Sequence, residues 1–443
     1  MSRDPHRLPP AGRSLGLVFF PAYDWAISPT HPEREERLLY TQDQLREEGL
    51  FDIPGISEHK PGLAESEDVQ RVHFTPPGLE RVTDTAHYVS AGSAITAADL
   101  VLSGLTDRAF ALTRPPGHHA MRVVQGGRGF CNVNIEAIMI ERLRRDHGIR
   151  RVAIVDTDCH HGDGSQDIYW HDPDTLFISI HQDGRTLYPG SGAVDELGGP
   201  KARGSTVNIP LPPDTGDEGF LLAARRIIRP LLDEWKPELI VNSAGQDNHF
   251  TDPIAHMRLS ARGYGRLMDC IDPHLAVLEG GYSIQGALPY VNLAIILAMA
   301  GLDYSQVIEP RWQDSMSSTE PRILDYIGRL AEKVLHLHRH PDRADHGYVR
   351  ERGFWVRERS IFYDTDGISE KQREELYDCP QCPGFLVIHT SSGKRGRSLA
   401  VESPRAACSA CRQKAEDIYR RTVAEGSPAE FGDRAADRYE RNF

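Results

Sequence analysis

The chain lacks any apolar run long enough to cross a bilayer. Its most apolar late segment, residues 287–302, is interrupted by Pro289 and Asn292. It is also shorter than the roughly 20 residues that a membrane-spanning helix needs. Residues 1–10 contain no apolar core of the kind found in secretory leaders. These absences favour a protein that neither spans a membrane nor carries a signal peptide.

Positive charge and cysteine are also scarce. Lys and Arg number 51 against 64 Asp and Glu, so the formal net charge is -13. This balance argues against a general nucleic-acid or anionic-membrane binder, although it allows a local basic patch. The 7 cysteines are odd in number, and four of them form a metal-binding pattern rather than a disulfide framework. We therefore expect a reducing, cytoplasmic environment.

The length and the apolar pattern predict an α/β domain over residues 15–304. A chain of 443 residues exceeds what one hydrophobic core usually holds, so more than one domain is expected. Continuous apolar runs alternate with helical stretches, which is typical of a doubly wound parallel sheet flanked by helices. The expected strands are Leu17–Phe20, Phe110–Thr113, Val152–Val155, Leu176–Ile180, Ser205–Ile209, Leu239–Asn242 and Leu275–Glu279, and the expected helices are Glu33–Glu48, Ala91–Leu102, Asn134–Asp146, Glu218–Trp235, Ala261–Met268 and Leu288–Ala300.

The sequence changes character after this domain. Residues 305–378 are charged and predict a connecting extension with one helical stretch near Ile323–Leu337. Residues 379–415 predict a small zinc ribbon, and residues 416–443 a C-terminal helical tail. The function of this whole region is open at the level of the sequence.

The ribbon is predicted from two C-x2-C pairs that flank a hairpin-like segment at 385–401. The cysteines are Cys379, Cys382, Cys408 and Cys411. Four thiolates close a tetrahedral zinc site with no open position, and a module this small needs the metal to fold. The alternative is four buried or reactive thiols, which does not explain the prolines and the hairpin that accompany them.

A second cluster of ligand-type residues follows the apolar run 152–155. Residues 156–164 read Asp-Thr-Asp-Cys-His-His-Gly-Asp-Gly. Ionised groups at the end of a buried strand are expensive to desolvate unless they are paired or bind a metal. Asp158 and His160 stand at i and i+2 and project to one side in extended backbone. A carboxylate and an imidazole suit zinc or a similar metal, so we expect a catalytic metal site here.

The best third ligand is Asp247, which follows the expected strand 239–242 and Gly245. Taken alone, this aspartate would be a helix cap or a turn residue. In a doubly wound sheet, however, sites form beyond the carboxyl ends of the strands. That placement favours Asp247 as a ligand beside Asp158 and His160.

The groups needed for proton transfer are also present at strand ends. His118 and His119 follow the rigid turn 115–117, and two imidazoles can supply a base and an acid for hydrolysis. Asp156 and Asp163 are carboxylates that could fix the tautomers of these histidines. Tyr282 follows a Gly-Gly turn and could donate to an oxyanion. The alternatives are structural histidines and a half-buried core tyrosine.

These residues resemble the histone-deacetylase-like zinc amidohydrolases of the arginase/deacetylase superfamily, closest to the class II and bacterial branch and related to the acetylpolyamine amidohydrolases. The resemblance covers residues 15–304 in the order of the family. Its motifs are Arg114-Pro-Pro-Gly-His-His119, Gly129-Phe-Cys-Asn-Val-Asn134, Asp156–Gly164, Ser179-Ile-His181, Tyr188-Pro-Gly190, Gly245-Gln-Asp247 with Asp252-Pro253, and Glu279-Gly-Gly-Tyr282.

The resemblance implies a role for each matching residue at the catalytic centre. Asp158, His160 and Asp247 would bind the catalytic zinc. His119, with Asp163 behind it, would be the main base and acid. His118 paired to Asp156 would stay more positive, and Tyr282 would donate to the oxyanion.

The resemblance also implies a substrate tunnel and a second cation. Phe130 and Tyr188 would wall a narrow tunnel lined by the Gly129 backbone, and Ile254 would lie at its substrate end. A monovalent cation, usually potassium in the family, would bind main-chain oxygens of Asp156, Asp158 and His160 together with Ser179.

Two departures from the family pattern concern the substrate. The family often has an acidic residue on the tunnel rim, and Asp84 is the candidate that the sequence offers. Polyamine-selective relatives can carry a glutamate after the Asp-Pro dipeptide, where this chain has Ile254. The sequence therefore does not choose between a protein acetyl-lysine, an acetylpolyamine and a small acetylated amine.

We expect a zinc-dependent amidohydrolase that removes an N-acyl group, above all acetyl, from an acylated amine. The first alternative is a scaffold or binding protein that keeps the fold and acts through its ribbon. The second is an arginase-like ureohydrolase, which would need two metals and further aspartates. No membrane or nucleic-acid partner is expected, and a homo-oligomer is compatible with the sequence.

Overall fold

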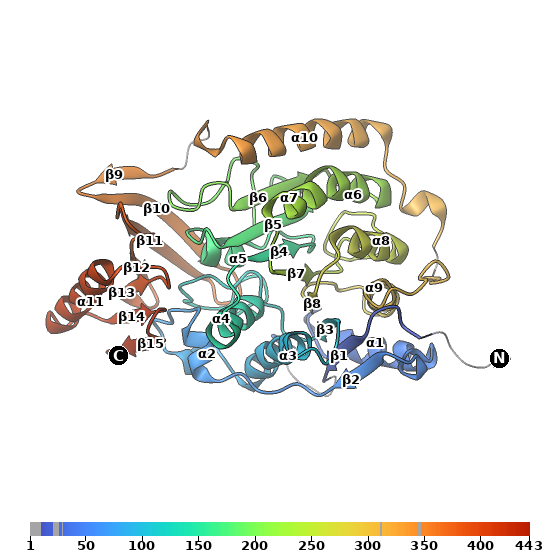
Figure 1. Ribbon diagram of the computed structural model, residues 1–443, viewed down its shortest axis with the longest axis horizontal. Coiled ribbons are helices and arrows are strands. Elements are labelled where there is room, and N and C mark those ends of the chain that lie inside the picture. The colour runs from blue at the N-terminus through green and yellow to red at the C-terminus, as the bar shows by residue number, and fades with distance from the viewer. Residues whose placement is uncertain (1–9, 21–25, 29, 311, 344–346) are drawn as a thin grey trace.

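The larger part of the molecule is built on an eight-stranded sheet in the order β2-β1-β3-β8-β7-β4-β5-β6 (Figure 1). The computed structural model describes residues 10–20, 26–28, 30–310, 312–343 and 347–443. All neighbouring strands of this sheet run parallel. The strands are β1 Leu15–Phe19, β2 Ile56–His59, β3 Arg108–Leu112, β4 Val152–Asp156, β5 Thr175–Gln182, β6 Thr206–Leu211, β7 Leu239–Ala244 and β8 Leu275–Leu278. The doubly wound α/β fold is thereby confirmed.

Helices cover both faces of this sheet, and this explains why its strands are apolar throughout. In β4, Val152 and Ile154 pack into the core beneath α3 and α4, whereas Ala153 and Val155 pack into the core beneath α1, α8 and α9. The helices are α1 Glu36–Glu47, α2 Ser66–Gln70, α3 Thr85–Leu102, α4 Ile135–His147, α5 Asp163–Tyr169, α6 Asp217–Ala223, α7 Arg229–Trp235, α8 Ala261–Ile271, α9 Leu288–Met299, α10 Pro321–Arg339 and α11 Ser409–Ala424.

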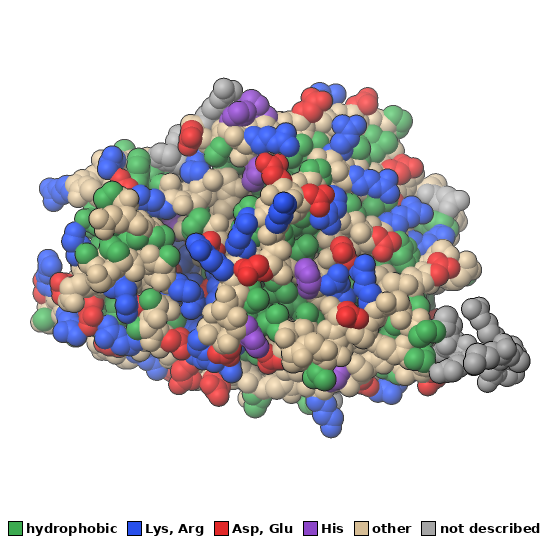
Figure 2. Space-filling view, in the orientation of Figure 1, with side chains coloured by type: hydrophobic (Ala, Val, Ile, Leu, Met, Phe, Trp, Pro, Cys, Tyr) green, Lys and Arg blue, Asp and Glu red, His purple; other side chains and the backbone are tan. Residues whose placement is uncertain are grey.

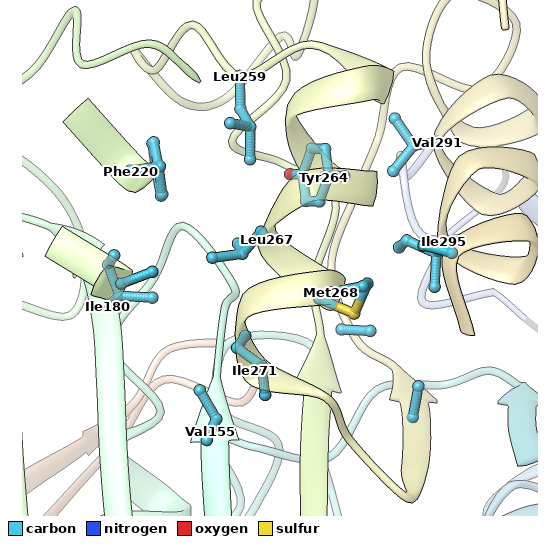
Figure 3. Packing of buried hydrophobic residues seen from close by; sticks show 14 of the residues in the cluster. Val155, Ile180, Phe220, Leu259, Tyr264, Leu267, Met268, Ile271, Val291 and Ile295 are labelled. Carbon is cyan, nitrogen blue, oxygen red and sulfur yellow. The ribbon is translucent and has the colours of Figure 1, made fainter. Parts of the chain in front are cut away.

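The centre of the larger core lies around α8 (Figure 3). Tyr264, Leu267 and Ile271 of this helix are fully buried. They pack with Ile180 of β5 and with Ile295 of α9 in one cluster. This packing fixes α8 and α9 on the sheet, and with them the loop that runs from β8 to α9.

The C-terminal part forms a second sheet of seven strands in the order β15-β14-β13-β12-β11-β10-β9. Its pairs are antiparallel except for β13 and β14. Figure 1 shows this sheet at one end of the molecule, with α11 on its outer side. The strands are β9 Val349–Glu351, β10 Phe354–Tyr363, β11 Ile368–Tyr377, β12 Leu386–Ser392, β13 Gly396–Ser403, β14 Ala429–Asp433 and β15 Arg438–Arg441.

The secondary structure of this part differs from the sequence-based expectation. Helix α10 matches the helical stretch expected near residues 323–337, but β10 and β11 occupy the expected charged extension, and β14 and β15 occupy the expected helical tail. The reason is that the inward face of β11 carries Glu370, Gln372 and Glu374, all of them buried. A strand with a polar buried face lacks the alternation by which strands are predicted. The hairpin expected for the ribbon corresponds to β12 and β13, which lie at the centre of a larger sheet. The domain boundaries stay a prediction.

Within the described residues, no helix is both long and apolar enough to cross a membrane.

Replacing Leu267 by Ala tests the core around α8. The side chain is 0% exposed, so its truncation should lower the free energy of unfolding by about 2–5 kcal/mol. Urea unfolding followed by circular dichroism measures this. Leu105→Ala is the matched control because Leu105 is 70% exposed, and its effect should stay within about 0.5 kcal/mol. Equal unfolding midpoints for the two variants would contradict the assigned packing.

Candidate active site

The polar clusters of the sequence meet where the carboxyl ends of adjacent strands form one edge of the parallel sheet. His118 and His119 follow β3, Tyr282 follows β8, Asp247 follows β7, and residues 157–163 follow β4, which ends at Asp156. Since β3, β8, β7 and β4 are consecutive neighbours in the sheet, segments far apart in sequence converge at this edge.

Asp158, His160 and Asp247 present one potential ligand atom each, and these atoms lie within 4.8 Å of one another. The His160 Nδ1 atom is 3.1 Å from Asp158 Oδ1 and 2.8 Å from Asp247 Oδ2. The other carboxylate oxygens are held by the backbone: Gly280 N donates to Asp158 Oδ2 at 2.8 Å, and Cys159 N donates to Asp247 Oδ1 at 2.7 Å. Two buried carboxylates and an imidazole fit a zinc-type divalent cation, which would neutralise the charge that burial makes costly.

Two glycines allow this close approach. A Cβ atom on Gly245 would lie 2.1 Å from Asp158 Oδ2, and one on Gly280 would lie 2.6 Å from Asp247 Oδ2. Any larger residue at either position would displace a carboxylate of the candidate metal centre. The glycines of the two motifs are therefore explained by space around the ligands.

Each histidine of the pair is held by its own aspartate. His118 Nδ1 lies 3.0 Å from Asp156 Oδ2, and His119 Nδ1 lies 2.7 Å from Asp163 Oδ1. An Nδ1–H that donates to a carboxylate leaves Nε2 as the free nitrogen of a neutral ring. The centroids of the two rings are 4.1 Å apart, so the charge of one histidine acts directly on the other.

The surroundings shift the pKa values of these two histidines in opposite directions. Burial opposes the charged form of His118, but the carboxylates of Asp158 and Asp156 outweigh it and raise its pKa well above the usual range. Burial and the neighbouring His118 lower the pKa of His119 to about 3, although Asp163 opposes this shift. His119 is thus in the neutral form that can accept a proton, and His118 is cationic.

The side chain of Tyr282 is buried. Burial raises the pKa of Tyr282 well above its usual range, so the hydroxyl stays protonated and can donate a hydrogen bond at neutral pH. Its backbone N–H donates to Asp252 Oδ2 at 2.8 Å. Its ring meets the Phe130 ring edge to face with centroids 5.6 Å apart.

Phe130, Gly129 and Tyr188 also gather beside the histidines. The Tyr188 and His119 ring centroids are 5.2 Å apart. Gly129 and Phe130 have positive φ values of 51° and 70°. A Cβ atom on Gly129 would lie 2.3 Å from the His119 ring, so glycine is required where the backbone passes the histidine. Ile254 is half-buried, and its N–H donates at 3.0 Å to Asp252, the aspartate that also accepts the Tyr282 N–H.

Two of the expected monovalent-cation residues lie side by side on neighbouring strands, Asp156 at the end of β4 and Ser179 within β5. Asp156 of β4 is in register with Ser179 of β5. Asp158 N donates to Asp156 Oδ1 at 3.0 Å, and the Ser179 hydroxyl is 2.9 Å from His181 Nδ1. His160 follows Asp158 by two residues in the sequence. The potassium site stays a prediction.

The structure adds positioning residues that the sequence did not single out. Arg37 Nε donates to the Gly281 carbonyl at 2.7 Å, and a second nitrogen of Arg37 donates to the Glu279 carbonyl. The guanidinium also lies 5.1 Å from the Tyr282 ring centroid. Glu33 is fully buried and forms ion pairs with Arg37 at 3.0 Å and with Arg114 at 2.7 Å. The helical pattern around residues 33–48 gave no sign of these partners, because they come from loops distant in sequence.

Asp84, the candidate rim acid, is the N-cap residue of α3. Its side chain accepts a hydrogen bond from Ala86 N at 2.8 Å and lies 2.9 Å from His87 Nδ1. This is an ordinary helix-capping arrangement. A different carboxylate, Asp364, lies against the tunnel residues.

The four cysteines of the expected ribbon also converge. Cys379 and Cys382 lie between β11 and β12, Cys408 and Cys411 lie at the start of α11, and their sulfur atoms are within 4.8 Å of one another. Gln381 N and Gly384 N donate to the sulfurs of Cys379 and Cys382 at 3.5 and 3.4 Å. The bond from Gln381 lowers the pKa of Cys379 to about 7. Such a cluster is consistent with a zinc ribbon.

Comparisons with known proteins agree with this geometry. The family "Histone deacetylase domain" matches residues 77–297. A probable deacetylase of Archaeoglobus fulgidus is 48% identical over 324 residues, which cover 67% of this chain and 89% of that protein. The acetoin utilization protein AcuC of Bacillus subtilis is 31% identical over 337 residues, covering 68% and 86% of the two chains. The crystal structure of the HDA15 HD domain superposes with a TM-score of 0.63 at 25% identity, covering 74% of this chain and 96% of that one.

The fold and the site define a doubly wound α/β protein with its polar functional groups at the carboxyl edge of a parallel sheet. The chain belongs to the histone deacetylase family. The family resemblance inferred from the motifs is confirmed, and it indicates hydrolase activity.

Cys408→Ser tests the four-cysteine site. We expect the purified wild-type protein to contain about two zinc ions per chain, one in each cluster, and the variant to lose one of them and to melt at lower temperature. Metal analysis and thermal unfolding measure both effects. Cys270→Ser, a half-buried cysteine outside the cluster, should keep the zinc content of the wild-type protein. A full zinc content in Cys408→Ser would rule out this thiol as a ligand.

Proposed function

We propose that the protein hydrolyses N-acyl amides, above all N-acetyl amides, and releases acetate and a free amine. The candidate substrates are acetylated lysine side chains, acetylpolyamines and small acetylated amines. The observation that carries the proposal is the convergence of three groups around Asp158, His160 and Asp247. They are His119, whose pKa is lowered, His118, whose pKa is raised, and the protonated phenol of Tyr282.

We assign the catalytic cation to Asp158, His160 and Asp247, and we propose zinc. When bound, such a cation polarises the acyl carbonyl and makes water more acidic. We also propose potassium near Asp156, Asp158, His160 and Ser179, where the end of β4 is in register with Ser179 of β5. The four-thiolate ribbon favours a reducing compartment such as the cytoplasm.

The histidines would divide the proton transfers between them. His119 is neutral, and its Nδ1–H donates to Asp163 at 2.7 Å, so Nε2 would accept a proton from the attacking water. The same nitrogen would then deliver that proton to the leaving amine. His118, held cationic by Asp156 and Asp158, would stabilise the negative charge that develops on the acyl group.

Tyr282 would donate its hydroxyl proton in a hydrogen bond to the oxygen that gains charge. The Gly-Gly turn and the grip of Arg37 on the carbonyls of Glu279 and Gly281 hold this tyrosine in place. Phe130 and Tyr188 would hold the apolar stem of the acylated amine, because aromatic walls suit an aliphatic chain. These two side chains would contact the acyl-amide end of the substrate, which the three candidate classes share.

Tyr282→Phe tests the proposal. Loss of one oxyanion donor should lower kcat by about 10²–10³-fold while zinc content and melting temperature stay those of the wild-type protein. Acetate released from a panel of acetyl-lysine peptides, acetylpolyamines and other N-acetylated amines measures turnover. Tyr290→Phe on α9 is the control for the loss of a phenol elsewhere, and its rate should not change.

Turnover on one class of substrate that is lost in Tyr282→Phe would establish the reaction and name the class. Metal-loaded protein that releases no acetate from any member of the panel would contradict the proposal.

A further inference from the structure

The segment 120–130, which joins His119 to Phe130, lies along the C-terminal sheet. Met121 packs in one buried cluster with Ile361, Tyr363 and Ile368 of β10 and β11. The Val123 carbonyl accepts a hydrogen bond from the Tyr363 hydroxyl at 2.7 Å. Gln125 and Arg122 of the same segment bind Thr390 at 2.8 Å and Glu402, respectively. The backbone between the expected base and the tunnel phenylalanine is therefore supported by residues beyond the catalytic domain.

Buried contacts fix the second sheet on the first part of the molecule. Arg71 forms a bidentate pair with Asp437 at 2.7 and 3.0 Å. Glu374 is buried and accepts hydrogen bonds from His171 at 2.5 Å and from the Tyr348 hydroxyl at 2.6 Å. Removing a partner from a buried carboxylate such as Glu374 is strongly destabilising. A module held in this way keeps one position relative to the active site.

A cleft of about 580 Å³ remains between the two parts. Figure 2 shows this hollow beside the C-terminal sheet, and the basic side chains that line the cleft are arginines. Its arginines already form ion pairs with lining acids, for example Arg144 with Asp172 at 2.6 Å and Arg405 with Glu141 at 3.3 Å. The contacts that reach the active site come instead from the turn between β10 and β11.

This turn, residues 364–367, holds two walls of the tunnel. Asp364 Oδ1 accepts hydrogen bonds from Gly129 N and from the Tyr188 hydroxyl, each at 3.0 Å. Asp366 Oδ2 accepts a third bond from Gly127 N at 2.7 Å. One carboxylate oxygen thus joins the Gly129 backbone to the ring that faces it.

The position of these walls decides the width of the tunnel beside His119. The Tyr188 ring contacts the His119 ring, and a Cβ atom on Gly129 would lie 3.0 Å from the Tyr188 ring and 2.3 Å from the His119 ring. Without an acceptor at this point, the Gly129 N–H and the Tyr188 hydroxyl would turn to water, and neither wall would be fixed.

A second line of contacts runs from strand β10 to His119, the expected base. The Phe362 carbonyl accepts a hydrogen bond from Arg128. The Nε atom of Arg128 donates to Asp163 Oδ2 at 3.0 Å, and Asp163 Oδ1 holds His119. Strand β10 therefore supports the aspartate that orients the histidine.

We propose that the C-terminal sheet is part of the active site and that Asp364 is a positioning residue, which fixes Gly129 and Tyr188 around the acylated amine. This inference rests on the proposed amidohydrolase function. The ribbon takes part because Lys394, in the β12–β13 turn, donates to the Asp366 carbonyl at 2.6 Å and so braces the turn that carries Asp364.

Asp364→Ala and Asp364→Asn, compared in the full-length zinc-loaded protein, test the proposal. The alanine removes the acceptor, so KM for the best acetylated substrate should rise about tenfold, while kcat falls much less, because the walls bind substrate and transition state alike. The asparagine keeps one carbonyl oxygen, so its KM should stay within about twofold of the wild-type value. The control is Glu358→Gln. Glu358 is an exposed carboxylate on β10 that pairs with Arg373, and its replacement should leave KM and kcat unchanged.

Hydrogen exchange of the peptide covering residues 119–130 gives a readout without turnover. Asp364→Ala should speed exchange of the Gly129 amide and leave β4 as protected as in the wild-type protein. Unchanged KM and unchanged exchange in an active protein would overturn the inference. An asparagine variant as poor as the alanine variant would do so too, because charge rather than an acceptor would then matter.

The failure of this inference is distinguishable from failure of the proposed function. A wild-type protein that cleaves no acyl-amide rejects the function, and the exchange experiment still decides whether Asp364 fixes the segment.

Discussion

The structure depends on how buried negative charge is compensated at one edge of the parallel sheet. Asp156, Asp158, Asp247 and Glu279 all have 0% exposure, and isolated carboxylates in such surroundings would be very costly. These four carboxylates are compensated in three ways. Asp156 has His118, Glu279 accepts the N–H groups of Gly117 and His118 at 2.8 and 3.1 Å, and the pair Asp158 and Asp247 shares His160.

Neighbouring charges also give the two adjacent histidines different pKa values. At His118 the carboxylates of Asp158 and Asp156 outweigh burial and raise the pKa, whereas at His119 burial and the neighbouring His118 outweigh Asp163 and lower the pKa. The opposite pKa directions follow from these different neighbours. A difference between two identical side chains thus arises from the partners that the sheet edge brings to each.

Much of the catalytic edge could be predicted because its residues lie directly after apolar strands. Asp158, His160 and Asp247 follow β4 and β7, and the rule that sites form beyond strand ends is enough to bring them together. Arg37 and Arg128 could not be predicted in this way. Each acts on groups far away in sequence, and an arginine on a helix or in a loop carries no local pattern that names its partner.

The C-terminal region shows why the rest of the fold was harder to predict. Glu370 and Glu374 point into the molecule from β11, so the pattern of polar residues resembles that of a solvent-exposed extension. Edge strand β2 was missed for a related reason, because its four residues include Ser57, Glu58 and His59. Polar residues whose partners come from another part of the chain hide a strand from analysis of the sequence alone.

The contacts of Asp364 have a consequence for the order in which the protein is made. The ribosome synthesises the catalytic aspartates and histidines first and the β10–β11 turn about 200 residues after Asp163. A nascent chain that has emerged only as far as α9 holds every residue of the candidate metal centre but lacks the acceptor for Gly129 and Tyr188. The Gly129 backbone and the Tyr188 ring therefore gain this shared acceptor only after the second sheet has been synthesised.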